Sequence, residues 1–189
     1  MDLLKRHIRG FTLVEIIVVV ALIGLLASAA YVSYGEVRTE ARDRKRMADL
    51  RQLQLAIENY KQVHGRYPLG GCGYLPSGGW VGPGPSNTSW HRTCAEYISG
   101  LVPDFISALP TDPNRENESD RGFMYKTDAS GTQYKVLVYQ TVERLFVDNF
   151  DHEFSRCSRI YNPSDGCTTQ SAIRSTYAIY SHGSDAPSW

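Results

Sequence analysis

Apolar and charged positions separate sharply along the first part of the chain. Residues 11–34 carry one charged side chain in 24 positions, whereas residues 36–46 carry eight in 11. A helix of 24 residues spans about 36 Å, which is enough to cross a hydrocarbon layer of about 30 Å. The pattern predicts an apolar, membrane-spanning helix over 11–34 that leads into a polar body.

A second helical pattern follows the apolar run without interruption. No Gly or Pro occurs from Glu36 to Lys61, and apolar residues recur there at spacings of three and four, at Met47, Leu50, Leu53, Ile57 and Tyr60. This is the stripe of an amphipathic helix, and Gly65 followed by Pro68 marks its end. We therefore predict one helix over about 11–63, whose amphipathic part at 35–64 packs against a globular head at 65–189.

The head has the pattern of a small β-structure. Residues 65–85 hold 12 Gly or Pro in 21 positions, which predicts an irregular loop. Residues 123–126, a loop at 127–131 and the β-rich stretch 133–140 predict a hairpin, and 176–180 predicts a last strand. The predicted fold class is α+β, with one long N-terminal helix packed against a small antiparallel sheet.

Glu15 conflicts with a plain apolar segment. A carboxylate inside an apolar helix costs about 2.5–3.5 kcal/mol on insertion scales. An ordinary secretory signal, cut after Ala27-Ser28-Ala29, has no use for that carboxylate, and neither has a passive anchor. The third interpretation is a precursor that is cut before the apolar run, and the short leader at 1–10 supplies the basic residues Lys5, Arg6 and Arg9.

The residues around Glu15 carry a specific motif. Gly10-Phe11-Thr12-Leu13-Val14-Glu15, followed by an apolar helix, resembles the cleavage and methylation motif of type IV prepilins and type II secretion pseudopilins. The resemblance implies that a prepilin peptidase removes residues 1–10, cuts between Gly10 and Phe11, and methylates the new amine of Phe11. It also implies that Glu15 of one subunit neutralises the Phe11 amine of its neighbour, because a buried charge costs much less when it is paired. That pair would set the stagger of a filament.

The resemblance implies a structural filament subunit and no enzyme. The first reading is a type IV pilin, held in the inner membrane by a single pass as a precursor and then assembled into a cell-surface pilus. The alternative is a pseudopilin of a periplasmic type II secretion pseudopilus. An alternative of another class is a membrane-anchored or secreted binding module whose N-terminus mimics a prepilin.

The same resemblance names the partners. They are further copies of the chain and other pilins, the prepilin peptidase, the membrane, and an inner-membrane assembly platform with its ATPase. Twenty basic residues balance 20 acidic ones, so composition gives no reason to expect nucleic acid. The charge run from Arg38 to Arg46 is either a solvated helix face or a set of side chains that pair between subunits.

Four cysteines lie in the head. The inserted anchor places the head outside the cytoplasm, where disulfides persist. Four thiols allow three pairings, and we favour the sequence-local one, Cys72–Cys94 and Cys157–Cys167. The second bridge would close a loop before the last strand, as the C-terminal disulfide loop of many type IV pilins does. This long disulfide-bonded head favours the pilin reading. A zinc site is the rival interpretation, but the chain has no C-x-x-C pair.

Other candidate chemistry is sparse. Ser181-His182 is a neighbour pair without a triad, no G-x-S-x-G occurs, and no catalytic residue is predicted. Oxygen-bearing side chains alternate like calcium ligands at Asp112, Asn114, Glu116, Glu118 and Asp120. Asn117 replaces the glycine that such a loop needs, and Phe123 stands in place of its bidentate Glu. We expect a solvated acidic turn without a cofactor or metal, and calcium is the minor alternative.

Overall fold

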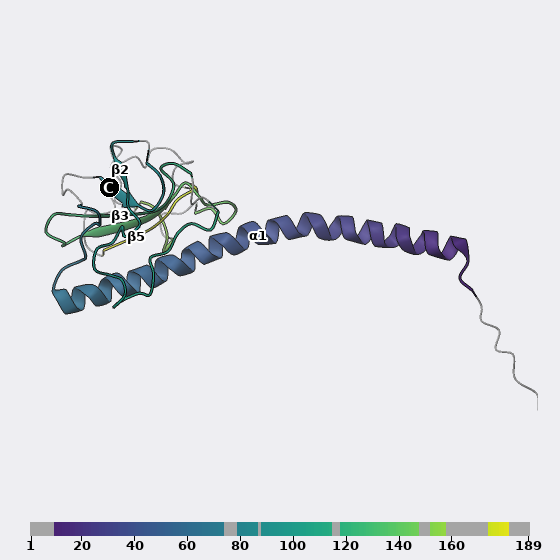
Figure 1. The fold of residues 1–189 in the computed structure, drawn as a ribbon, viewed down its shortest axis with the longest axis horizontal. Coiled ribbons are helices and arrows are strands. Elements are labelled where there is room, and N and C mark those ends of the chain that lie inside the picture. Colours follow the sequence, from purple (N-terminus) through teal and green to yellow (C-terminus); the bar gives the residue numbers. More distant parts are fainter. Residues whose placement is uncertain are drawn as a thin grey trace, which may run out of the picture. The chain divides into compact units, whose positions relative to one another are not determined.

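The computed structural model describes residues 10–73, 79–86, 88–114, 118–147, 152–157 and 174–181, except for the side chains of residues 29–33. These residues form helix α1 (Leu13–His64) and strands β1 (Trp80–Gly82), β2 (His91–Thr93), β3 (Gly122–Thr127), β4 (Tyr134–Tyr139) and β5 (Tyr177–Tyr180) (Figure 1). The chain divides into two compact units, Met1–Arg38 and Thr39–Trp189. The predicted α+β class and the long helix are confirmed.

The helix ends where the sequence places its stop signal. Gly65 has a φ of +73°, a conformation that a residue with a side chain rarely adopts. Its amide donates to the carbonyl oxygen of Lys61 at 2.8 Å and so satisfies one of the last helical carbonyls. The chain then turns back toward the sheet, where the amide of Tyr67 donates to the carbonyl of Gly131 at 2.8 Å.

The sheet corrects one part of the prediction. Its strand order is β2-β1-β3-β4-β5, and β1 pairs with β2 in parallel, so the sheet is mixed and not purely antiparallel. β2 follows β1 in the chain after a short connection, residues 83–90, and lies beside it in the same direction. The predicted hairpin is present, and β3 and β4 pair from Gly122↔Tyr139 to Thr127↔Tyr134. The last strand, β5, pairs with β4 in antiparallel fashion.

One face of the sheet and one face of the helix share a hydrophobic core. Leu50, Leu53 and Ile57 of α1 are fully buried, as the apolar stripe predicts. They belong to the same core cluster as Phe123 and Tyr125 of β3, and Figure 1 shows this part of α1 running along the sheet. The helix from Thr39 onward is therefore an integral part of the head.

A disulfide ties the loop after α1 to the end of β2. Cys72 and Cys94 are bonded, with their Cα atoms 5.9 Å apart, and they are the first of the two expected pairs. Cys157 is disulfide-bonded as well. Its expected partner, Cys167, lies outside the described residues.

Candidate assembly site

The start of α1 places the motif residues together. Thr12 precedes the first helical residue, and its amide and its Oγ1 both donate to Oε2 of Glu15, at 2.7 and 2.8 Å. The amide of Glu15 donates back to Oγ1 of Thr12 at 3.3 Å. This reciprocal arrangement is a capping box, in which the third helical residue satisfies the free amide that precedes the helix. Within a single chain, Glu15 is therefore held at the helix start by Thr12.

The expected cleavage bond lies just outside this capped helix. Gly10 and Phe11 are not helical, both are exposed, and a Cβ built on Gly10 would meet no atom within 4 Å. The side chain of Phe11 is 84% exposed. The peptide bond between them is thus open to another molecule, while the rest of the leader, residues 1–9, lies outside the described residues.

The apolar residues that follow find no packing partner within one chain. Every large hydrophobic side chain from Phe11 to Leu26 is at least 50% exposed. A contiguous apolar surface of this kind marks a site of contact with a membrane or another protein. By length and apolarity taken together, no helix among the described residues qualifies as a membrane span.

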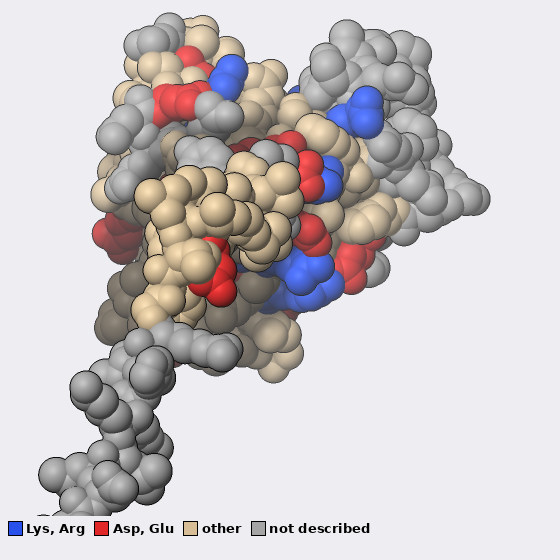
Figure 2. All heavy atoms as spheres, turned by 90° about the vertical axis from the view of Figure 1, so that its right-hand side faces the viewer, with Lys and Arg blue, Asp and Glu red and all other residues tan. Residues whose placement is uncertain are grey.

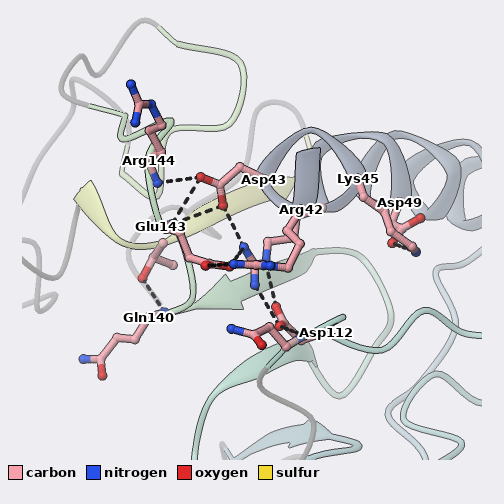
Figure 3. Close-up of polar contacts among 11 residues, drawn as sticks. Arg42, Asp43, Lys45, Asp49, Asp112, Gln140, Glu143 and Arg144 are labelled. Carbon is pink, nitrogen blue, oxygen red and sulfur yellow. Dashed lines mark hydrogen bonds and ion pairs between the residues drawn. The ribbon is translucent and has the colours of Figure 1, made fainter. Parts of the chain in front are cut away.

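The charged stretch after this segment forms a second site, in the other unit. Arg46 is fully buried, and its guanidinium reaches three carboxylates: Asp112 at 2.8 and 2.9 Å, Asp43 at 2.7 Å and Glu143 at 3.0 Å. Arg42 binds Glu143 through both its Nε, at 2.7 Å, and its Nη2. We call these five residues, Arg42, Asp43, Arg46, Asp112 and Glu143, the charge cluster (Figure 3).

The protonation states of the charge cluster follow from its pairing. Burial alone would raise the pKa of Asp112, but the hydrogen bonds and charge of Arg46 outweigh it and lower the pKa of that carboxyl. Hydrogen bonding from Arg42 lowers the pKa of Glu143, although partial burial opposes it. Both groups are therefore ionised at neutral pH, and so is Arg46, whose raised pKa reflects its three anionic partners despite its burial.

This cluster corrects two expectations. The run from Arg38 to Arg46 was expected to be solvated or to pair between subunits, but Asp43 and Arg46 are fully buried in the head of their own chain. Exposed pairs do occur beside them, such as Lys45 with Asp49 at 2.8 Å. Asp112 was expected in a solvated acidic turn and is instead 3% exposed, because it receives the guanidinium of Arg46.

Two further members of the alternating acidic stretch, Glu118 and Asp120, are engaged with side chains of the head. Asp120 accepts from Thr88 and contacts His91, while Glu118 pairs with Arg121 at 2.7 Å. Glu116 lies outside the described residues. Within the described part of the chain, no three His, Cys, Asp or Glu side chains gather in a way that could hold a metal ion.

The surface charge does not gather by sign on the face shown in Figure 2. Basic and acidic side chains lie next to one another there. Arg51 and Glu153, with 61% and 56% of their side chains exposed, form one such pair of opposite charge on the surface of the head. Such interleaving fits the balanced composition and presents no extended cationic surface on this face.

Comparison with known proteins agrees with the N-terminal motif. Residues 5–31 match the family model described as the prokaryotic N-terminal methylation motif. The chain is similar to type II secretion system core protein G of Klebsiella pneumoniae, with 40% identity over 131 residues, or 68% of this chain and 74% of that protein.

Shorter alignments join the chain to other proteins of the same name. Identity is 36% over 64 residues with that of Aeromonas hydrophila and 34% over 86 residues with that of Dickeya chrysanthemi. These two alignments cover 34% and 44% of this chain, and 45% and 56% of the relatives, so the chain spans about half their length. No solved structure matches significantly.

Proposed function

Since this chain belongs to the family of the type II secretion system core protein G, we propose that it is a structural, pilin-like filament subunit of the pseudopilin type. The proposal rests on one observation above all. The first part of α1, whose large apolar side chains up to Leu26 are all at least half exposed, begins with a capped carboxylate, Glu15, shortly after the Gly10–Phe11 bond. Such a surface is stable only in a membrane or against other copies of itself.

The proposed sequence of events starts in the inner membrane. A prepilin peptidase cuts after Gly10 and methylates Phe11, and the assembly platform with its ATPase then extracts the subunit into a filament in the periplasm. The new amine of Phe11 lies four residues before Glu15. In the filament, Glu15 pairs with the Phe11 amine of the neighbouring copy, and Thr12 presents the carboxylate by holding it at the helix start.

A type IV pilus subunit is the second candidate, and the disulfide-bonded head favours it. The Cys72–Cys94 bond joins two residues that are 22 positions apart in the sequence, and Cys157 takes part in another disulfide. Deletion of the gene that encodes this chain separates the candidates. A pseudopilin predicts loss of protein secretion without loss of surface filaments in its own deletion strain, and a pilus subunit predicts the opposite pattern.

The first test concerns processing. We expect a mature chain that begins at N-methylated Phe11, and Gly10→Val should block the cut because the peptidase site needs a small residue there. Intact-mass and N-terminal peptide analysis of membrane-derived protein gives the answer. A mature N-terminus at Ala30 would instead support an ordinary secretory signal and end the proposal.

The second test concerns assembly. Glu15→Leu leaves the Phe11 amine buried and unpaired at every subunit, at a cost of about 3–5 kcal/mol each, so filaments should be lost while cleavage continues. Glu15→Asp keeps the charge with a shorter reach and should give partial assembly. The measurement is the yield of sheared filaments at matched subunit levels. Wild-type yield from Glu15→Leu would refute the pairing role.

A further inference from the structure

The segment that follows β4 is held on the helix by one carboxylate. We call residues 140–147 the strap. Three consecutive strap amides donate to Asp43: Glu143 at 3.1 Å, Arg144 at 2.7 Å and Leu145 at 2.9 Å. Asp43 belongs to α1 and is fully buried. One side chain of the helix therefore satisfies amides that in a strand would be paired with a neighbouring strand.

Other hydrogen bonds reach the strap as well, among them one from the amide of Gln140 to Oγ1 of Thr176 at 3.1 Å. The amide of Val142 donates to the carbonyl of Ser175 at 3.2 Å, and the hydroxyl of Tyr177 donates to the carbonyl of Leu145 at 2.6 Å. Beneath the strap, Val142 and Val147 are 7% and 2% exposed and belong to the main core cluster. The strap thus closes one end of the core and depends on a single ionisable anchor for three successive amides.

Charged side chains from several elements surround Asp43. On its own helix Asp43 binds the guanidinium of Arg46, and on the strap it accepts the amide of Glu143. Burial and the negative charge of Asp43 both raise the pKa of Tyr177 in β5. Asp112 also accepts a hydrogen bond from Arg46, and Arg42 pairs with Glu143. The side chain of Arg144 points away from the cluster (Figure 3). Three carboxylates thus share two guanidiniums, and only Asp43 receives strap amides as well.

We propose that the strap is an acid-released latch, which leaves α1 when protonation of Glu143 breaks its ion pairs with Arg42 and Arg46, while the β3–β4 hairpin stays formed. The hairpin has a full ladder of backbone pairs and contains no carboxylate in its strands. Its loop does contain Asp128, which accepts the amides of Thr132 and Gln133 at 2.7 and 2.8 Å. Burial opposes ionisation of Asp128, but these and other hydrogen bonds lower its pKa to about 2, so the loop keeps its carboxylate to lower pH than an ordinary Asp would. Release of the strap would uncover Val142 and Val147 and open the end of the core beside β5.

The sign of the effect follows from Glu143. Pairing with Arg42 lowers the pKa of its carboxyl in the folded chain. A carboxyl with a lowered pKa stabilises the folded state above its unfolded pKa of about 4.3 and loses that contribution as the pH falls through the folded value. The latch is therefore closed at neutral pH and opens as the pH falls through the lowered pKa of Glu143.

Hydrogen exchange of the full chain in detergent micelles tests the proposal. Protection factors, corrected for the intrinsic exchange rate at each pH, are measured from pH 7 to pH 2.5. We expect the protection factors of the amides of residues 143–145 to fall at least about tenfold at a pH where the β3–β4 amides keep theirs. A tenfold change in an equilibrium corresponds to a shift of one pKa unit. Asp43→Asn should bring the same loss to neutral pH.

The matched control is Asp49→Asn. Asp49 lies on the same helix and pairs with Lys45, away from the strap in Figure 3, so its loss should leave residues 143–145 protected. If Asp43→Asn fails to fold, Glu143→Gln removes only the carboxylate that pairs with Arg42 and Arg46. This change should raise the pH at which the strap opens. Simultaneous loss of protection in the strap and the hairpin, or strap protection that is unchanged in the Asp43 or Glu143 variant, would overturn the proposal.

Discussion

Arg46 is the residue that joins the three carboxylates of the charge cluster. Its guanidinium is fully buried and contacts Asp43, Asp112 and Glu143, so it cannot be removed without leaving carboxylates in a poorly solvated place. Breaking a buried ion pair by deleting one partner is far more costly than never having built it. The buried charges therefore add little net stability, but they fix how the helix, the turn at Asp112 and the segment after β4 fit together.

Arg46→Met measures this dependence, because methionine keeps apolar bulk and removes the charge. We expect a loss of about 3–5 kcal/mol in the free energy of unfolding. Urea unfolding followed by tryptophan fluorescence provides the measurement. Arg44→Met is the control, since Arg44 is 72% exposed in its pair with Glu40 and its loss should cost less than about 1 kcal/mol. Equal losses in the two variants would contradict a buried, essential Arg46.

At the scale of elements, the spacing of apolar residues predicted the long helix and the hairpin. The stripe through Leu50, Leu53 and Ile57 fixed the helix and its buried face, and alternation in 133–140 fixed the hairpin. The charge cluster escaped prediction because Asp112 and Glu143 are 66 and 97 residues from Arg46 in sequence. A signal was nevertheless present. Positions 43 and 46 continue the same helical stripe toward the N-terminus, so their charges lie on the buried face.

The short strands could not be predicted for a different reason. β1 and β2 have three residues each, and β1 lies among glycines and prolines, so neither shows a measurable alternation. Their place depends on close backbone approach. A Cβ built on Gly82 of β1 would lie 2.3 Å from the carbonyl oxygen of Phe123 in β3, which no side chain can tolerate. The N-terminal motif, in contrast, was legible at once because its residues are adjacent in sequence.

Gly82→Ala tests that close approach. The added methyl must push β1 away from β3, at a cost of about 1–3 kcal/mol in the free energy of unfolding. Gly79→Ala is the matched control, because a Cβ there would meet the carbonyl oxygen of Trp90 at an ordinary 3.5 Å. Its stability should change by less than about 1 kcal/mol. Urea midpoints of the two variants should therefore differ clearly, and coincident midpoints would mean that β1 is not held by this contact.

At the scale of the whole molecule, the two units differ in what they need from their surroundings. Thr39–Trp189 contains the core and the charge cluster, whereas the described large apolar side chains of the first unit, up to Leu26, are exposed. The boundary lies beyond the end of the apolar run and shortly before Arg42, whose side chain binds Glu143. On the proposed function, the first unit is covered by a membrane or by other subunits, while the second has a core of its own.

Two shortened chains test this division. A chain that begins at Thr39 keeps Arg42, Asp43 and Arg46 and should fold as a cooperative unit without detergent. A chain that begins at Met47 loses all three and leaves Asp112 and Glu143 without their partners. We expect it to be less stable by about 3–5 kcal/mol or more. Circular dichroism during urea unfolding compares the two, and equal midpoints would show that the helix before Met47 is dispensable to the head.

Because Asp43 binds main-chain amides of the strap, its contacts restrict some substitutions during evolution and permit others. Any residue except proline supplies the N–H that Asp43 receives from positions 144 and 145, so those positions are free to exchange side chains over evolutionary time. Position 43 has no such freedom, because an alanine or a lysine there would orphan three amides at once. Lineages descended from a common ancestor of this chain should therefore retain an acid at 43, exclude proline from 143–145, and vary widely at 144 and 145.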